Sequence, residues 1–312
     1  MTDQFGPEVW RGSVNAWECD QMGHLSARYY LALVRHGLPG FAAAIGLSGA
    51  FKETAERTLL VTDLHIRFLR EARLSALLHM TAGTVATEAD HLVVQFLLWH
   101  SGSGELAATM RVRLALIDAR GGERLAMPAE LTDRADALRI DCPEKAEPRS
   151  VTLEPMATRA CLAEADRLGL ICPSRGAIGA EMCDVFGRLR LEGFLAAITD
   201  GMPMVGPALR GDLADYLDIA PERIGGAMVE YRLIYHRYPR AGDRFEVRSG
   251  LAGVSERTMR IIHWLLDPET GQPWLSADGV VVSFDLDARK VIAIPPEAQA
   301  GMQEVITPGL GV

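Results

Sequence analysis

The stretch Cys19–Leu25, CDQMGHL, returns later in the chain as Cys183–Leu189, CDVFGRL. The offset of 164 residues holds without a gap over a 27-residue window, in which ten positions are identical. Self-similarity at a fixed distance is the sequence signature of a duplicated structural unit. The chain has 312 residues, enough for two domains of ordinary size, and is therefore expected to hold two copies of one module. The identical positions are Arg11, Gly12, Ala16, Cys19, Asp20, Gly23, Leu25, Leu31, Ala32 and Gly37 with their counterparts.

Four apolar runs follow the repeated motif in each copy. Most alternate partly between apolar and polar residues, as strands do, and Gly-, Ser- or Pro-containing turns separate them. Short turns between such runs predict an antiparallel meander. The runs are 59–68, 74–85, 92–99 and 106–117 in the first copy, and 227–238, 245–254, 258–266 and 274–286 in the second.

A helix is expected before the strands of each copy, at Ala27–Ile45 and at Leu191–Thr199, because apolar residues recur there at helical spacing. A further helix, Met156–Leu168, has no counterpart in the first copy. One helix against one face of an antiparallel sheet buries both apolar surfaces. The fold class is therefore α+β, two tandem hotdog modules in which a sheet wraps around a long helix.

The expected boundaries place module 1 at residues 1–138 and a Pro-containing, charged linker at residues 139–155. Module 2 then covers residues 156–312, with the further helix at its N-terminal end.

The composition excludes several functional classes. The formal net charge is −9, which disfavours a nucleic-acid partner. The N-terminal residues show neither a basic nor an apolar region typical of a signal peptide, and no apolar run reaches the ~20 residues of a membrane helix. Five cysteines without a CxxC pair argue against disulfides or zinc. We expect a cytoplasmic protein without a membrane partner, metal site or cofactor.

The segment Trp17–Leu31 resembles the opening motif of the hydroxybenzoyl-CoA thioesterase family and its acyl-ACP thioesterase relatives, roughly Asp-x-x-Gly-His-hydrophobe-Asn-Asn-x-x-Tyr. Asp20 falls on the family's catalytic aspartate, and Gly23, His24 and Tyr30 also fit. The resemblance implies hydrolysis of an acyl thioester, with acyl-CoA or acyl-ACP as the partner. In this family two modules pair with active sites at the seam, so the tandem chain is expected to form an intramolecular pseudo-dimer.

The two copies depart differently from this motif. Ser26 and Ala27 replace the Asn pair in the first copy. In the second copy, Asp184 is kept, but Arg188 stands where His24 stands. The resemblance therefore implies two unequal sites, with the first copy the better candidate for activity.

The chemistry assigns roles and leaves alternatives open. Asp20 serves as general base to water or as nucleophile, or it only caps its turn. His24 orients substrate, shares a proton with Asp20, or only bonds the turn. Tyr30 contacts substrate or packs in the core, and Asp184 is a second catalytic carboxylate or a turn residue. By resemblance, the oxyanion donor is a backbone N–H of the partner module's helix, near Gly193.

Substrate phosphates would need basic residues. Arg67 and Arg70 lie at the turn between two strands of the first copy, where guanidinium groups could bind phosphate. The same pattern also fits a solvated hairpin turn.

Two other functions keep the fold. A hotdog dehydratase or hydratase would use a histidine with a carboxylate, for which His24 and Asp184 across the seam are the pair available. A non-catalytic acyl-binding protein needs neither. Whether the double-module chain assembles further into a homo-oligomer stays open.

Overall fold

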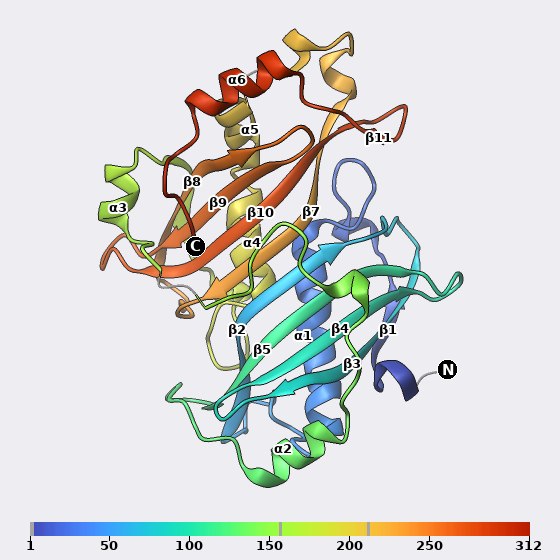
Figure 1. Cartoon of the computed structure of the whole chain (residues 1–312). Helices are drawn as coiled ribbons and strands as arrows, with labels where there is room; N and C mark the ends of the chain where they lie inside the picture. Colours follow the sequence, from blue (N-terminus) through green and yellow to red (C-terminus); the bar gives the residue numbers. More distant parts are fainter. Residues whose placement is uncertain (1–2, 156–157, 211–212) are drawn as a thin grey trace. The chain divides into compact units, whose positions relative to one another are not determined.

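The computed structural model describes residues 3–155, 158–210 and 213–312 (Figure 1). These residues form two compact units. The first unit holds the chain up to Pro148 together with Ala180–Gly193, and the second holds Arg149–Gly179 and Phe194–Val312. The motif of the second sequence copy therefore belongs to the first unit. Within the described ranges, no helix is long and apolar enough to cross a membrane.

The first unit is an antiparallel sheet with one long helix on one face. Its strand order is β1-β3-β4-β5-β2, and every neighbouring pair is antiparallel. The helix α1 joins β1 to β2 and passes behind the sheet in Figure 1. The elements are η1 (Asp3–Phe5), β1 (Glu8–Ser13), η2 (Ala16–Glu18), α1 (Ala27–Ala44), β2 (Arg57–Phe68), β3 (Leu77–Thr87), β4 (Leu92–His100), β5 (Leu106–Asp118), α2 (Ala129–Asp136), η3 (Glu144–Ala146) and η4 (Ala180–Met182).

An apolar stripe of α1 packs on the inner face of this sheet. Tyr30 meets Phe68 edge to face, with ring centroids 5.0 Å apart. Phe41 meets Phe96 in the same way, with centroids 6.2 Å apart. Both rings of the second pair are fully buried, so the helix and the sheet share one core.

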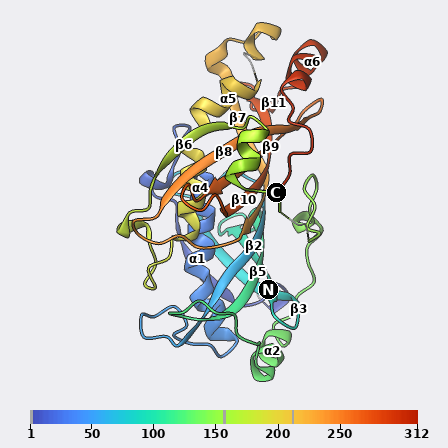
Figure 2. The same cartoon turned by 90° about the vertical axis from the view of Figure 1, so that its left-hand side faces the viewer.

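The second unit repeats the plan. Its order is β6-β8-β9-β10-β7, which matches the first order strand for strand, and the pairs are again antiparallel. Figure 2 gives a second view of these strands and helices. The elements are α3 (Leu162–Arg167), β6 (Ile171–Ala177), α4 (Leu191–Thr199), α5 (Met202–Arg210), η5 (Leu213–Tyr216), η6 (Pro221–Arg223), β7 (Ile224–Tyr235), β8 (Arg244–Val254), β9 (Met259–Leu266), β10 (Pro273–Asp285), β11 (Lys290–Val291) and α6 (Pro296–Glu304).

This architecture is the tandem hotdog fold. In each module a short strand leads through a turn into a helix, and four long antiparallel strands follow. All eight predicted long strands are observed with ends shifted by a few residues, and α4 has the predicted bounds. The prediction of the α+β class with two hotdog modules is therefore confirmed.

Other helices differ from the sequence prediction. The predicted helix Met156–Leu168 is observed only as α3, while residues 156 and 157 lie outside the described ones. The helix begins at Leu162, because Cys161 is extended and caps it, with Sγ accepting from the Glu164 amide. The helices α2, α5 and α6 were not predicted, because Pro, Gly and charged residues interrupt their apolar spacing.

The core of the second unit contains a buried imidazole. His263 on β9 is fully buried, and its Nδ1 lies 2.7 Å from the Ser249 hydroxyl on β8. Burial penalises the charged ring and lowers the pKa of His263 to about 3. The ring is therefore neutral in the folded protein at ordinary pH.

Because His263 is neutral in the folded protein, we expect the free energy of unfolding to depend on pH. The folded-state pKa lies below the unfolded value of about 6.5, so the unfolded chain takes up a proton first as pH falls. Between pH 7.5 and pH 5, the free energy of unfolding should drop by about 2 kcal/mol on account of His263. Urea unfolding at both pH values measures this drop, and His263→Phe should remove that share of it. An unchanged pH dependence in the variant would contradict the assignment.

Candidate active site

The motif at residues 20–24 forms a tight turn before α1. The Asp20 amide donates to the His24 carbonyl oxygen at 2.8 Å, and the Gly23 amide donates to the Asp20 carbonyl oxygen at 3.0 Å. Gly23 has φ 74°, a left-handed conformation that costs glycine little. The glycine of the motif therefore shapes the backbone that presents Asp20.

The Asp20 carboxylate uses one oxygen to hold this turn. Its Oδ1 accepts hydrogen bonds from the amides of Met22, at 2.8 Å, and His24, at 3.1 Å. Within the described part of the chain, no group hydrogen-bonds the other oxygen. Asp20 is exposed, so that oxygen is accessible to a water molecule or a substrate. One carboxylate oxygen of Asp20 therefore caps the turn, and the other is free to react with water or substrate.

His24 lies buried beneath the turn and pairs with Glu71, a residue that the sequence reasoning missed. His24 Nε2 lies 3.3 Å from Glu71 Oε2. The backbone also joins these segments, since the Leu25 amide donates to the Ala72 carbonyl oxygen at 2.7 Å. A carboxylate next to one ring nitrogen fixes the orientation and tautomer of an imidazole. Nothing short of the fold shows this pair, because Glu71 lies in an irregular loop after β2.

Tyr30 is buried in the first turns of α1, and its hydroxyl is hydrogen-bonded to the backbone of Ala72. Burial raises the pKa of Tyr30 far above its ordinary value, and the negative charges of Glu71 and Asp20 raise it further. Tyr30 is therefore a neutral phenol that packs against Phe68 and anchors the loop that carries Glu71.

The turn of the second copy reproduces the first. The Asp184 amide donates to the Arg188 carbonyl oxygen at 2.7 Å, and Asp184 Oδ1 accepts from the amides of Phe186, at 2.8 Å, and Arg188, at 3.0 Å. Gly187 has φ 75°. The shared Asp and Gly of the two motifs therefore form the same backbone turn twice.

The side chains around the second turn are different. Arg188 is buried, and its guanidinium donates to the carbonyl oxygens of Ala119 and Asp118 at the end of β5. Its role there is to bind backbone. Among the described residues, Asp184 is hydrogen-bonded to the amides of Phe186 and Arg188, and the carboxylate that pairs with His24 is Glu71.

The first three residues of α4, Leu191–Gly193, belong to the first unit, where they contact α1. Arg35 Nε donates to both carboxylate oxygens of Glu192, at 3.0 Å each. The Gly193 amide donates to the Arg190 carbonyl oxygen at 2.9 Å, so this N–H already has an acceptor. The proposed oxyanion donor near Gly193 therefore gains no support from this geometry.

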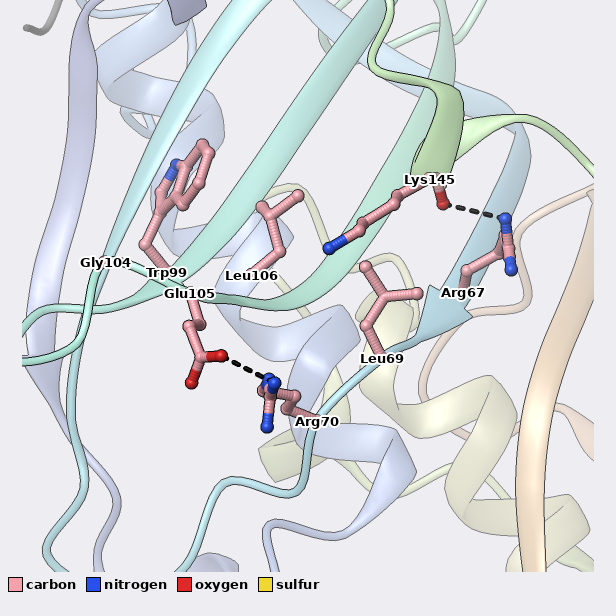
Figure 3. Close-up of a pocket in the computed structure, with 8 residues that line it drawn as sticks. All are labelled: Arg67, Leu69, Arg70, Trp99, Gly104, Glu105, Leu106 and Lys145. Atoms are coloured by element: carbon pink, nitrogen blue, oxygen red, sulfur yellow. Dashed lines mark hydrogen bonds and ion pairs between the residues drawn. The ribbon is translucent and has the colours of Figure 1, made fainter.

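Arg67 and Arg70 line an open pocket of about 670 Å³ in the first unit (Figure 3). The Arg67 guanidinium donates to the carbonyl oxygens of Lys145, at 2.9 Å, and Glu147, at 3.0 Å. Arg70 pairs with Glu105 at 2.5 Å. Both predicted phosphate ligands therefore share one pocket, but each already has an acceptor.

The same pocket contains an unpaired cation that the sequence reasoning missed. The Lys145 side chain extends from η3 toward Leu106, and Trp99 lies beyond Leu106 in this view (Figure 3). Among the residues that the structure describes, no carboxylate pairs with the Lys145 ammonium group. This group is the cation in the pocket that is available for an anion.

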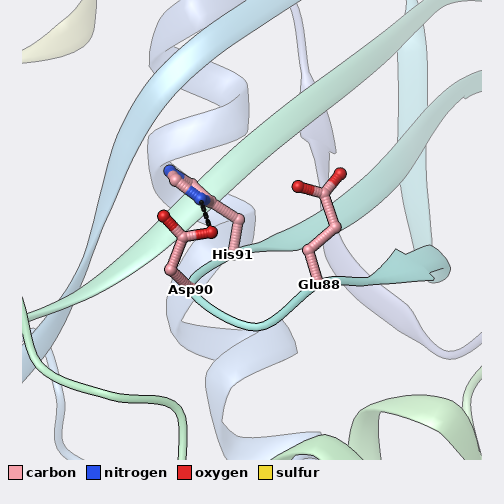
Figure 4. A group of neighbouring side chains, drawn as sticks. All are labelled: Glu88, Asp90 and His91. Atoms are coloured by element: carbon pink, nitrogen blue, oxygen red, sulfur yellow. Dashed lines mark ion pairs between the residues drawn. The ribbon is translucent and has the colours of Figure 1, made fainter.

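A second polar cluster contains Glu88, Asp90 and His91, whose potential ligand atoms lie within 4.8 Å of one another (Figure 4). His91 Nδ1 lies 2.7 Å from Asp90 Oδ1. Arg113 pairs with Glu88, and Arg124 pairs with Asp90. A metal ion would have to displace these arginines, so the cluster is better described as a group of ion pairs.

The sequence profile described as Thioesterase-like superfamily matches residues 14–135 and again residues 180–302. The two matches together span most of the chain and coincide with the two sequence copies.

One curated relative is the L-carnitine dehydrogenase/betainyl-CoA thioesterase of Rhizobium meliloti (strain 1021). It is 26% identical over 138 residues, which are 43% of this chain and 28% of that protein. The chain thus matches less than a third of the relative's length.

Two solved structures share the whole architecture. The 12:0-ACP thioesterase from Umbellularia californica has a TM-score of 0.65 at 13% identity, covering 88% of this chain and 93% of its own. An acyl-ACP thioesterase from Bacteroides thetaiotaomicron has a TM-score of 0.61 at 12% identity, covering 87% and 96%. These similarities establish the double-hotdog fold.

Proposed function

Given that the chain belongs to the thioesterase-like superfamily, a family of thioester hydrolases, we propose that Asp20 of its first module is the base or nucleophile of hydrolysis. The observation that carries the proposal is the contrast between two turns with one backbone geometry. The first turn carries the buried His24–Glu71 pair, and the charge of Asp20 acts on the phenol of the buried Tyr30. The position of Tyr30 is Phe194 in the second copy, and the position of His24 is the backbone-bound Arg188.

The accessible oxygen of Asp20 can act in two ways. It takes a proton from a water molecule, whose oxygen attacks the thioester carbonyl carbon, or it attacks that carbon itself. In the first route the carbon–sulfur bond breaks, Asp20 passes the proton to the leaving sulfur, and the acyl group leaves as a carboxylic acid. In the second route the thiolate leaves from an acyl–Asp20 anhydride, which a water molecule then hydrolyses: the hydroxyl completes the carboxylic acid, the remaining proton goes to the thiolate, and the Asp20 carboxylate is restored. The amides of Met22 and His24 bind Oδ1 of Asp20 and thereby fix the orientation of the carboxylate and of its accessible oxygen.

We propose acyl-CoA or acyl-ACP as the substrate and the cytoplasm as the location. Relatives support both carriers, since one is named a betainyl-CoA thioesterase and two are acyl-ACP thioesterases. The dehydratase alternative needs a histidine near the reacting carbon. His24 is buried and paired with Glu71, which favours a supporting role.

The test is release of free thiol from matched acyl-CoA and acyl-ACP panels by the full-length protein, with hydration of enoyl-CoA measured in parallel. Thiol release supports the proposal, and the faster panel identifies the carrier. Hydration of enoyl-CoA without thiol release would replace the thioesterase proposal with the hydratase function. If neither activity is detected, acyl binding without catalysis becomes the proposed function.

We also propose that the pocket of Arg67, Arg70 and Lys145 binds a phosphate of the carrier. Replacing Lys145 with Ala removes the available cation without touching the Asp20 turn. We expect KM for acyl-CoA to rise roughly fivefold with kcat unchanged, because an exposed charge contributes about 1 kcal/mol of uniform binding. Initial rates at low and moderate ionic strength measure this, with Lys52→Ala as the control. An unchanged KM at low salt would exclude the pocket.

A further inference from the structure

The pocket of Figure 3 lies within the first unit, and its lining is of two chemical kinds. Leu69, Leu106 and the half-buried Trp99 form an apolar part, and the cations Arg67 and Lys145 line the same pocket. The volume of about 670 Å³ is much larger than a free phosphate needs and lies in the range of pockets that hold drug-sized ligands. A ligand that fits this lining therefore has both an apolar part and an anionic group.

The positive charges of this pocket are only partly compensated. Arg70 pairs with Glu105, so these two side chains together contribute no net charge. Arg67 donates to the carbonyl oxygens of Lys145 and Glu147, which are neutral acceptors, and both of these hydrogen bonds use its Nη1. Among the residues that the structure describes, no carboxylate pairs with the guanidinium of Arg67 or the ammonium of Lys145. The pocket therefore presents two positive charges to a ligand.

Two positive charges match one kind of phosphate better than another. A phosphate monoester carries a charge of about −1.5 to −2 at pH 7, because its second pKa is about 6. A phosphodiester carries a single negative charge. The 3′-phosphate of CoA is a monoester at the end of a nucleotide, whereas the phosphate of an acyl-ACP is a diester that joins the pantetheine arm to the protein. The charge of the pocket therefore favours CoA over ACP.

The apolar part of the pocket favours the same carrier. Trp99 is fixed in place, because its Nε1 donates to the Thr81 hydroxyl at 3.1 Å and its ring stacks with His79. Apolar and aromatic side chains that are already ordered bind the nucleoside part of a ligand at a low cost in entropy. An ACP has no nucleoside next to its phosphate, so it would leave this part of the pocket unused.

The pocket and the Asp20 turn lie along one loop of the first unit. Arg70 lines the pocket, and the next residue, Glu71, pairs with His24 of the turn. Arg73 of the same loop forms an isolated β-bridge with His24. Consecutive Cα atoms lie about 3.8 Å apart, so this loop places the pocket close to the turn. The flexible pantetheine arm of CoA can therefore connect a nucleotide in the pocket to a thioester at Asp20.

We propose that this pocket binds the nucleotide end of acyl-CoA, with Arg67 and Lys145 at the 3′-phosphate, so that the substrate of the Asp20 site is an acyl-CoA and not an acyl-ACP. The inference deepens the proposed thioesterase function and rests on it. Nη2 of Arg67 and the Lys145 ammonium supply charge-assisted hydrogen bonds to the phosphate oxygens. Lys145 lies in η3, outside both sequence copies, so the segment between the copies contributes to the choice of carrier.

The test uses the full-length protein and compares free CoA with 3′-dephospho-CoA, which differ only in this phosphate. We expect calorimetry at low ionic strength to show that wild type binds CoA about tenfold more tightly, the typical effect of a hydrogen bond to a charged group. The difference should shrink at higher ionic strength, because salt screens exposed charges. The measurement needs no turnover.

Variants of Lys145 test the residue itself. Lys145→Met keeps the aliphatic stem and removes the charge, so it should weaken CoA binding about fivefold and leave dephospho-CoA binding unchanged. The preference for CoA should therefore fall to about twofold, and Lys145→Arg should restore most of it. Lys52→Met, at an exposed lysine of the first unit outside the pocket, is the matched control and should keep the tenfold preference.

The outcomes separate this inference from the proposed function. A preference for CoA that depends on Lys145 supports the nucleotide site even if no thioester is hydrolysed, in which case the proposed function fails on its own. Equal affinity for the two compounds, no measurable binding of either, or a tenfold preference that survives in Lys145→Met would overturn the inference. A kcat/KM for acyl-ACP above that for acyl-CoA with the same acyl group would also overturn it.

Discussion

Replacing Asp20 with Asn should lower kcat for thioester hydrolysis by roughly 10²-fold or more, because Asn removes the base or nucleophile. Asn keeps an oxygen that can accept from the amides of Met22 and His24, so the turn should persist. Steady-state thiol release measures the loss, and circular dichroism with thermal unfolding verifies that the fold is kept.

Asp184 supplies the matched control. Its turn has the same backbone hydrogen bonds, but Arg188 and Phe194 replace the histidine and tyrosine. Asp184→Asn should therefore leave kcat within about twofold of wild type, as expected for a surface change outside the chemistry. If Asp20→Asn is as active as wild type, or if both variants lose activity equally, the assignment of one catalytic turn is wrong.

Phe41→Ala should lower the free energy of unfolding of the first module by about 3–5 kcal/mol. Phe41 is fully buried in α1, and its ring packs edge to face on Phe96 of β4. Removing it deletes apolar contact and leaves a cavity in the helix–sheet interface. Urea unfolding monitored by tryptophan fluorescence measures the change, since Trp99 lies on the same strand as Phe96.

Leu77→Ala is the control for this prediction, because Leu77 on β3 is 64% exposed. Its effect should stay within about 0.5 kcal/mol, as for surface substitutions in general. If Phe41→Ala lowers the free energy of unfolding no more than Leu77→Ala does, the aromatic pair is not part of the core in solution.

The sequence alone determined the architecture, because the relevant signals are local or repeated. Apolar periodicity predicted α1 and α4, alternation and turn residues predicted the long strands, and the offset of 164 residues predicted the duplication. The Asp-x-x-Gly turn was also predictable, since Gly23 and Gly187 are the residues that tolerate a left-handed conformation.

Contacts between distant segments could not be predicted in the same way. Glu71 is a partner of His24 only because the folded chain brings the loop after β2 to the Asp20 turn. Arg67 is held by the backbone near Lys145, 78 residues away, and Lys145 itself is left available in the pocket. Sequence periodicity records which face a residue occupies, whereas the identity of its neighbours depends on strand register and chain crossing.

The core of the second module shows the same division. His263 and Ser249 are 14 residues apart and look unremarkable among the strand residues of the sequence. Only the register of β8 and β9 places them in one row, and only burial shows that His263 Nε2 has no partner. The sequence thus determined which elements form, while tertiary structure decided which side chains meet, because pairing and desolvation depend on the packed chain as a whole.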